Sequence, residues 1–159
     1  MTWTIRPIAA TEAACILPLL EQVHAIHVEA HPDHFPADPD RDELLAFLRD
    51  RLSNDAITAL VAFGPDGAAV GYLLCEIETR APSLLSLGER RGMLHHISVD
   101  QAWRRSGIGL ALIEDMKARL RAQGIARVVT IYGAFNGPSA ALMRRAGLEP
   151  FNIIAAGST

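Results

Sequence analysis

The chain has 159 residues, of which 50% are hydrophobic and 21% are charged, a composition typical of one soluble globular domain with its own core. Fifteen Lys and Arg against 18 Asp and Glu leave a net charge of -3, which argues against a dedicated nucleic-acid-binding protein. No long apolar run is present, so we expect neither a signal peptide nor a membrane segment. Cys15 and Cys75 lack metal-ligand spacing and are expected to be free thiols in a reducing cytoplasm.

The first half of the chain mixes helical and strand patterns. Alternating polar and apolar residues indicate strands, and apolar residues three and four apart indicate helices. Pro18 should either kink the first helix or mark its true start, because proline lacks the amide that helix interiors need. The turn Gly64-Pro65-Asp66-Gly67 favours an antiparallel hairpin. The expected elements are a strand over 2–7, a helix from Thr11, a loop over 31–40, a helix over 42–54, and strands over 56–63 and 69–78.

The second half predicts a strand–helix–strand crossover. Residues 81–92 have no clean period and contain Pro82 and Gly88, so we expect a mobile loop, and loops of this length are often functional. Antiparallel strands followed by one parallel crossover predict a single α/β domain over 1–159, with a mixed, mostly antiparallel sheet flanked by helices. The later elements are a strand over 93–100, a helix over 108–122 ended by Gly124, a strand over 127–133, a helix over 136–146 ended by Gly147, and a last strand over 151–155.

The most informative stretch joins the strand over 93–100 to the helix over 108–122. Gly107 and Gly109 lie in this turn, and a residue without a Cβ lets the backbone approach a ligand closely. The first amides of a helix have no acceptor within the helix and point in one direction, so together with the helix dipole they form an anion site. We therefore predict that this turn holds a phosphate-bearing cofactor.

A group of histidines is the second feature of interest. His24, His27 and His31 fall at helical spacing, and His34 follows shortly after. Three imidazoles on one helix face could bind a metal, which would imply a metal-dependent hydrolase. No Cys or suitably placed carboxylate completes a ligand set, so a solvated or substrate-facing helix edge is the simpler interpretation. We expect no metal.

Two motifs of this chain resemble those of the GNAT superfamily of N-acetyltransferases, which use acetyl-CoA. The family pattern Val-x-Pro-x-x-Arg/Gln-x-x-Gly-x-Gly/Ala matches residues 99–109, with Gln101 in place of the proline. The family pattern Asn-x-x-Ala-x-x-Leu-Tyr-x-x-x-Gly-Phe has its spacing intact over residues 136–148, with Met143 in place of the tyrosine. The element order agrees along nearly the whole chain, although the end is short by one strand. The resemblance implies a GNAT-like fold with a β-α-β core that binds acetyl-CoA.

The resemblance also implies which residues hold the cosubstrate. The backbone of Ile97 and Val99 would pair with the pantetheine arm as an extra strand would. Amides from Arg104 or Arg105 through Leu110 would hold the pyrophosphate, and Asn136 with the start of its helix would lie beside the thioester. The implied cofactor-binding residues are Ile97, Ser98, Val99, Arg104, Arg105, Ser106, Gly107, Ile108, Gly109, Leu110, Asn136 and Ser139.

The catalytic groups are less clearly indicated. The family's tyrosine is often assigned as the acid that protonates the leaving thiolate, and Met143 cannot donate a proton. Either water or the product supplies that proton, or Tyr132 substitutes. His95 lies four residues before Val99, at the same strand parity, and is our candidate base because imidazole suits proton transfer near neutral pH. The alternative for His95 is a hydrogen-bonded structural role.

Three neighbouring residues are weaker candidates. His96, on the opposite face by parity, ranks second as a base. Glu76 and Glu78 could attract a cationic amine or relay protons, or could be solvated strand residues.

The leading hypothesis is an N-acetyltransferase that moves an acetyl group from acetyl-CoA to a primary amine by direct attack on the thioester. The alternative is a non-catalytic acyl-CoA sensor or interaction module, which Met143 motivates. The acceptor is a small-molecule or protein amine, and the loop 81–92 and the acidic segment 33–42 should shape its pocket, with a slight lean towards cationic amines. We expect a cytoplasmic protein with no nucleic-acid or membrane partner, and a homodimer if a second subunit covers the open sheet edge.

Overall fold

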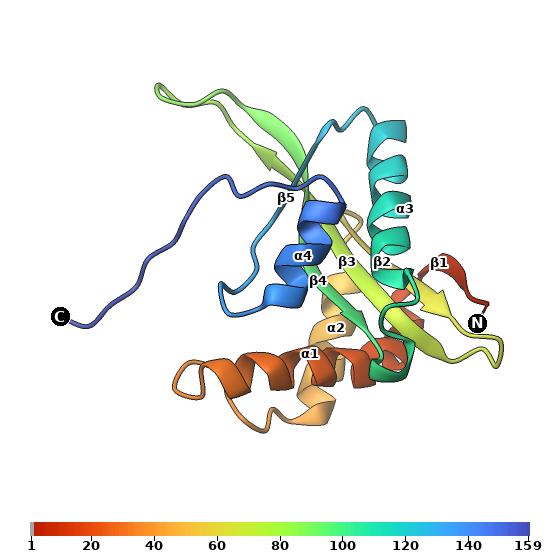
Figure 1. Cartoon of the computed structure of the whole chain (residues 1–159). Helices are drawn as coiled ribbons and strands as arrows, with labels where there is room; N and C mark the ends of the chain where they lie inside the picture. The colour runs from red at the N-terminus through yellow and green to blue at the C-terminus, as the bar shows by residue number, and fades with distance from the viewer. Residues whose placement is uncertain (1) are drawn as a thin grey trace.

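The computed structural model describes residues 2–159, and Figure 1 shows one twisted sheet with helices on both of its faces. None of the helices in this range is long and apolar enough to cross a lipid bilayer. In chain order the elements are β1 (Thr4–Ile8), the 3-10 helix η1 (Ala10–Ile16), α1 (Leu17–Ala30), α2 (Arg41–Leu52), β2 (Ile57–Phe63), β3 (Ala69–Arg80), β4 (Glu89–Val99), the 3-10 helix η2 (Gln101–Trp103), α3 (Ile108–Ala122), β5 (Arg127–Thr130) and α4 (Gly137–Arg145).

The five strands follow the order β1-β2-β3-β4-β5. Strands β1 to β4 pair antiparallel, and β5 pairs parallel to β4 after the crossover through α3. This arrangement confirms the predicted mixed, mostly antiparallel sheet. Strand β5 pairs only with Arg91–Leu94 of β4, whereas β4 continues to Val99. The two strands therefore diverge after Leu94, and the later part of β4 keeps an edge that β5 does not cover.

The core has one half on each face of the sheet, because successive side chains of a strand point to opposite faces. Leu73 and Cys75 of β3 pack against α3 and α4, while Tyr72 and Leu74 pack against η1, α1 and α2. All four are 5% exposed or less. Burying a side chain such as Leu73 contributes about 1.5–3 kcal/mol to stability. The sheet that carries the site is thus supported rigidly from both sides.

The helix boundaries have local causes. Pro18 lies in the first turn of α1 and marks its true start, since η1 precedes it as a separate 3-10 helix. Helix α2 begins at Arg41 because the carboxylate of Asp40 accepts a hydrogen bond from the Glu43 amide at 2.9 Å. Gly124 and Gly147 follow the ends of α3 and α4, as predicted.

The prediction of a mobile loop over residues 81–92 was partly wrong. Strand β4 already begins at Glu89, which pairs with Arg80 of β3. The charged residues at the start of β4 suggested a loop. In the structure the Arg91 guanidinium binds Glu78 at 2.9 Å and Glu89 at 3.1 Å, so these charges are paired across and along the strands. Residues 81–88 connect β3 to β4 at the end of a long hairpin (Figure 1).

The predicted strand over residues 151–155 does not form, and β5 ends at Thr130 rather than at residue 133. The C-terminal segment runs away from the body of the protein as an extended chain (Figure 1). Phe151 is 76% exposed and Ile153 is 92% exposed. The Arg127 guanidinium lies 4.7 Å from the Phe151 ring centroid. After Phe151 the segment leaves the sheet (Figure 1). An apolar β-favouring sequence needs a strand edge to pair with, and this segment does not lie along one.

Candidate active site

A β-bulge in β4 determines where the two adjacent histidines point. Leu74 of β3 pairs with His96, but the next β3 residue, Cys75, pairs with Leu94, so His95 is the extra residue. The alternation of faces is interrupted at this point. Ile97 still pairs with Leu73, on the face covered by α3.

The predicted parity of His95 was therefore wrong. His95 does not share a face with Ile97 and Val99, because it is the extra residue of the bulge and its side chain points to the same face as that of His96. Its side chain binds Glu76, which in turn binds Arg51 of α2, so it lies on the face covered by α1 and α2. His96 pairs with Leu74 on that same face, and both histidines face the same side of the sheet.

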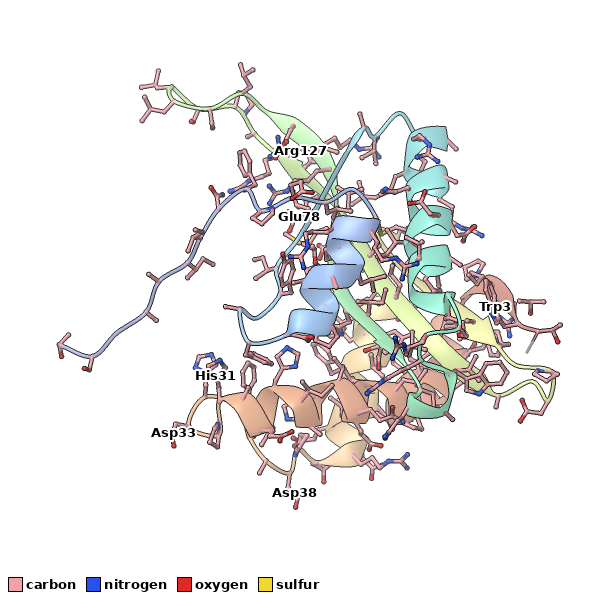
Figure 2. All side chains as sticks on the ribbon, in the orientation of Figure 1. Trp3, His31, Asp33, Asp38, Glu78 and Arg127 are labelled. Carbon is pink, nitrogen blue, oxygen red and sulfur yellow. The ribbon has the colours of Figure 1, made fainter. Side chains whose placement is uncertain are left out.

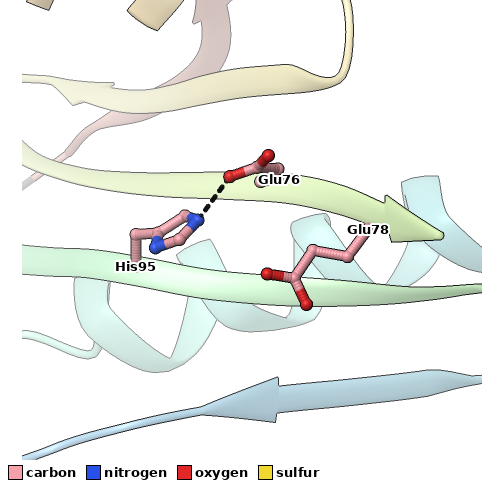
Figure 3. A group of neighbouring side chains, drawn as sticks. All are labelled: Glu76, Glu78 and His95. Carbon is pink, nitrogen blue, oxygen red and sulfur yellow. Dashed lines mark hydrogen bonds and ion pairs between the residues drawn. The ribbon is translucent and has the colours of Figure 1, made fainter. Parts of the chain in front are cut away.

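His95 and Glu76 form a close pair (Figure 3). His95 Nε2 lies 2.7 Å from Glu76 Oε2, and Arg51 Nη2 donates to the same oxygen at 3.3 Å. An ionised carboxylate can only accept, so Nε2 carries the hydrogen, and in the neutral form of the imidazole Nδ1 keeps its lone pair. The side chains of His95 and Glu76 are 28% and 26% exposed. The arrangement presents an imidazole with a fixed tautomer and a free basic nitrogen.

A cavity of about 270 Å³ lies beside this pair, between α1, β4 and the segment from Thr130 to Ser139. It opens where β4 and β5 diverge. Met143 of α4 also lines it and is 1% exposed. The cavity thus brings together His95, His96 and Tyr132 from the predicted catalytic set, while Glu76 reaches it only through His95. Rings from four parts of the chain line it, namely His24, His27, Phe35, His95, His96 and Tyr132.

The environment of His96 keeps its imidazole uncharged near neutral pH. Burial, followed by the nearby His95, Arg51 and His27, lowers the pKa of His96 to about 4. Tyr72 Oη lies 3.5 Å from His96 Nδ1, and burial raises the pKa of the Tyr72 hydroxyl, which stays protonated. His96 is therefore a polar but neutral part of the cavity wall.

The turn after β4 has the geometry of the predicted anion site. Gly107 adopts φ +88°, and the preceding Arg105 adopts φ +64°, a conformation that side-chain-bearing residues rarely take. Within residues 2–159, no carbonyl oxygen accepts from the amides of residues 106–110, and Ala111 is the first amide to bond back, to Gly107. These free amides stand at the positive end of the α3 dipole.

Close contact between helices explains the second glycine. A Cβ on Gly109 would lie 3.1 Å from Leu142 Cδ2, so a side chain there would force Leu142 to shift where the start of α3 meets α4. Asn136 Oδ1 accepts from the Ser139 amide at 3.0 Å and caps α4. The segments that carry the two sequence motifs thus pack against each other, and Asn136 and Ser139 of the second motif line the cavity.

The histidines of α1 have structural partners. His24 donates from Nε2 to the Pro36 carbonyl at 2.7 Å, and His27 donates from Nδ1 to the Val23 carbonyl at 2.8 Å. His31 packs against Phe135, with ring centroids 5.2 Å apart.

The described residues that could hold a metal by geometry are instead Glu76, Glu78 and His95, whose ligand atoms lie within 4.8 Å of one another (Figure 3). Arg51 and Arg91 already bind the two carboxylates.

Two residues of this region carried no signal in the sequence. Phe35 lies in a segment that the pattern identifies only as a loop, and Arg51 is one of several charged residues on an amphipathic helix. Both reach the site through tertiary packing, and only a correct placement of α1 and α2 on the sheet would have found them.

The sequence matches the model of the Acetyltransferase (GNAT) family over residues 20–148. No curated protein matches the chain. Among solved structures, a tetramutant of the BH1408 protein from Bacillus halodurans has a TM-score of 0.88 at 16% identity, covering 98% of this chain and 99% of that one. The aminoglycoside 6'-N-acetyltransferase AAC(6')-Ih from Acinetobacter baumannii has a TM-score of 0.75 at 17% identity, covering 99% and 98%.

A third solved structure, AAC(6')-Iy in complex with the bisubstrate analogue CoA-S-monomethyl-acetylneamine, has a TM-score of 0.77 at 19% identity and covers 100% of this chain and 99% of that chain. At these identities the structural likeness concerns the fold. The family match is evidence for family membership as well as for the fold, because it spans most of the chain and includes both the glycine turn and the α4 motif. The chain belongs to the GNAT family of acetyltransferases.

Proposed function

We propose that the protein is an N-acetyltransferase that transfers the acetyl group of acetyl-CoA to a primary amine by direct attack on the thioester. Family membership supplies the acetyl transfer. The observation that carries the rest is the His95–Glu76 pair, because the His95 side chain lines the cavity between the diverging strands while its Nε2 is held by Glu76. A base at this point meets what the reaction requires, because the attacking amine has to lose a proton.

The chain's own groups fit the cosubstrate. Acetyl-CoA supplies the activated acetyl thioester. The free amides of residues 106–110 suit its pyrophosphate, and the uncovered edge of β4 at Ile97–Val99 suits the amides of its pantetheine arm. Arg104 Nε already donates to the Val99 carbonyl at 3.3 Å, which leaves one lone pair of that oxygen for a second donor.

The proposed reaction needs two proton transfers, one from the attacking amine and one to the leaving thiolate. His95 Nδ1 accepts the proton from the amine, and Glu76 stabilises the imidazolium through Nε2. Met143 stands where the family has its tyrosine and cannot protonate the leaving thiolate, so Tyr132 or water supplies that proton. A thiolate is a good leaving group, so the reaction tolerates a weak acid here.

Met143 also favours a second candidate, a protein that binds acyl-CoA as a sensor without turnover. One experiment separates the two. Acetyl-CoA is incubated with a panel of primary amines while a thiol reagent reports free CoA, and calorimetry measures acetyl-CoA binding to wild type and to Gly109→Glu. We expect binding and turnover by the wild type and loss of binding in Gly109→Glu. Binding without turnover on any amine would establish the sensor, and no binding would overturn both.

The base is tested with His95→Gln, which can still donate to Glu76 but cannot accept a proton. We expect kcat to fall roughly 10²–10⁴-fold and the pH–rate profile to flatten near neutrality. His31→Gln removes an exposed histidine that does not line the cavity and serves as the matched control. An unchanged kcat in His95→Gln would make His95 structural.

A further inference from the structure

In the part of the chain that the structure describes, the cavity beside His95 has neither a carboxylate nor an ammonium or guanidinium group in its lining, which contains no Asp, Glu, Lys or Arg. Its polar side chains are imidazoles, hydroxyls and the Asn136 amide, and His96 is held neutral near pH 7. An acceptor with several ammonium groups would have to leave water for a wall that offers no carboxylate, which is costly.

The carboxylates nearest to the cavity do not make it more favourable for a polycation, because each already has a cationic partner. Glu76 binds Arg51 and His95, and Glu78 binds Arg91, whose side chain is only 13% exposed. Their charges are therefore neutralised before any substrate arrives. A polycation would have to compete with guanidinium groups held in place by the fold.

The acidic segment over residues 33–42, from which the sequence suggested a lean towards cationic amines, does not supply carboxylates to the cavity either. Its acidic residues are exposed, and Figure 2 shows Asp33 and Asp38 pointing away from the body of the protein. Asp40 is used as the cap of α2. Phe35 is the residue that this segment contributes to the cavity.

The side chains that do face the cavity suit a flat apolar body. Phe35 is fixed by neighbouring rings, with His27 at 5.3 Å and His34 at 4.9 Å between centroids. Tyr132 adds an aromatic ring from the segment after β5, and Leu20 and Val23 add aliphatic surface from α1. Walls of this composition bind ligands through apolar contact and ring stacking. The cavity of about 270 Å³ also has to admit the acetyl thioester, because Ile97, Asn136 and Ser139 line it too, and this leaves room only for a small acceptor.

We propose that the acceptor is a small primary amine with a single ammonium group on an aromatic body, an arylalkylamine, whose ring packs against Phe35 while its nitrogen reaches His95. This inference rests on the proposed function and deepens it. The one positive charge that the acceptor brings is removed in the reaction itself, because the ammonium proton passes to solvent or to His95 before the nitrogen attacks. Polyamines and aminoglycosides retain further charges that the cavity cannot pair.

The test compares kcat/KM for 2-phenylethylamine, spermidine and sisomicin with acetyl-CoA at saturation. We expect 2-phenylethylamine to exceed both polycations at least tenfold. A preference for spermidine or sisomicin would overturn the inference while leaving acetyl transfer intact. Turnover of none of these three while another primary amine of the panel is acetylated would overturn the inference alone. Turnover of no amine at all, with acetyl-CoA still bound, would overturn the proposed function as well, so the two failures are distinguishable.

Variants at one residue locate the aromatic contact. Phe35→Ala and the milder Phe35→Leu should raise KM for 2-phenylethylamine, by roughly tenfold for alanine, with a smaller effect on kcat. Calorimetry with acetyl-CoA checks that both variants are folded. Phe151→Ala removes a phenyl ring from the exposed C-terminal segment and is the matched control. An unchanged KM in both Phe35 variants would show that the acceptor does not contact this ring.

Discussion

Lowering the pH from 7 to 5 should destabilise the protein through His96. Burial lowers the pKa of His96 from 6.5 to about 4 in the folded protein. The unfolded chain therefore binds the proton more tightly than the folded one, so the contribution of His96 to stability is present above about pH 6.5 and is lost as the pH falls towards 4. Between pH 7 and pH 5 the loss is about 2 kcal/mol, taking about 1.36 kcal/mol for each pKa unit.

The assay is urea unfolding at pH 7, 6 and 5, followed by far-UV circular dichroism, for wild type and His96→Asn. Asparagine retains an acceptor for the Tyr72 hydroxyl but does not titrate. The free energy of unfolding of the variant should fall less steeply with pH, by about 2 kcal/mol over this range. His34→Asn removes an exposed imidazole and controls for the loss of a histidine as such. Parallel pH dependences for wild type and His96→Asn would refute the conclusion that His96 is buried and neutral in the folded protein.

Two further predictions concern the cofactor end of the site. Gly107→Ala should destabilise the protein by about 1–2 kcal/mol in thermal melts and weaken acetyl-CoA binding, because φ at this residue is +88°; equal stability would mean that the turn relaxes without cost. Asn136→Ala should lower the free energy of unfolding in urea by about 1 kcal/mol, since the Ser139 amide loses its cap; a change below 0.3 kcal/mol, roughly the noise of such data, would show that the cap adds nothing.

Much of the fold follows from local patterns. Hydrophobic periodicity places β3 and α3 close to their observed positions. The glycines of the turn indicate its unusual backbone, because their requirement is conformational and acts within a few residues. The parallel crossover follows from the element order. These features depend on short-range chemistry, which a single sequence displays directly.

The errors come from features that depend on pairing between distant segments. The bulge at His95 changes which face the histidine occupies, and the alternation of a strand contains no mark of an inserted residue. The sequence did not predict the early start of β4, because a charged residue such as Arg91 indicates a solvent-exposed loop. Only the fold shows that Glu78 lies beside it and pairs with its charge. The C-terminal apolar segment has the composition of a strand, but a strand also requires an edge to pair with, which composition cannot report.

The bulge has a consequence for how this enzyme can change over evolution. In the proposed mechanism, β4 after the bulge supplies the edge that suits the pantetheine arm, and the bulge itself presents His95 and His96 to the acceptor. Deleting one residue here would make the β3–β4 ladder regular and remove the base from the acceptor side. Substituting at the same place keeps the ladder irregular and alters only the acceptor chemistry. Cosubstrate recognition and acceptor choice are thus separable along a single strand, and the irregular pairing is the condition for that separation.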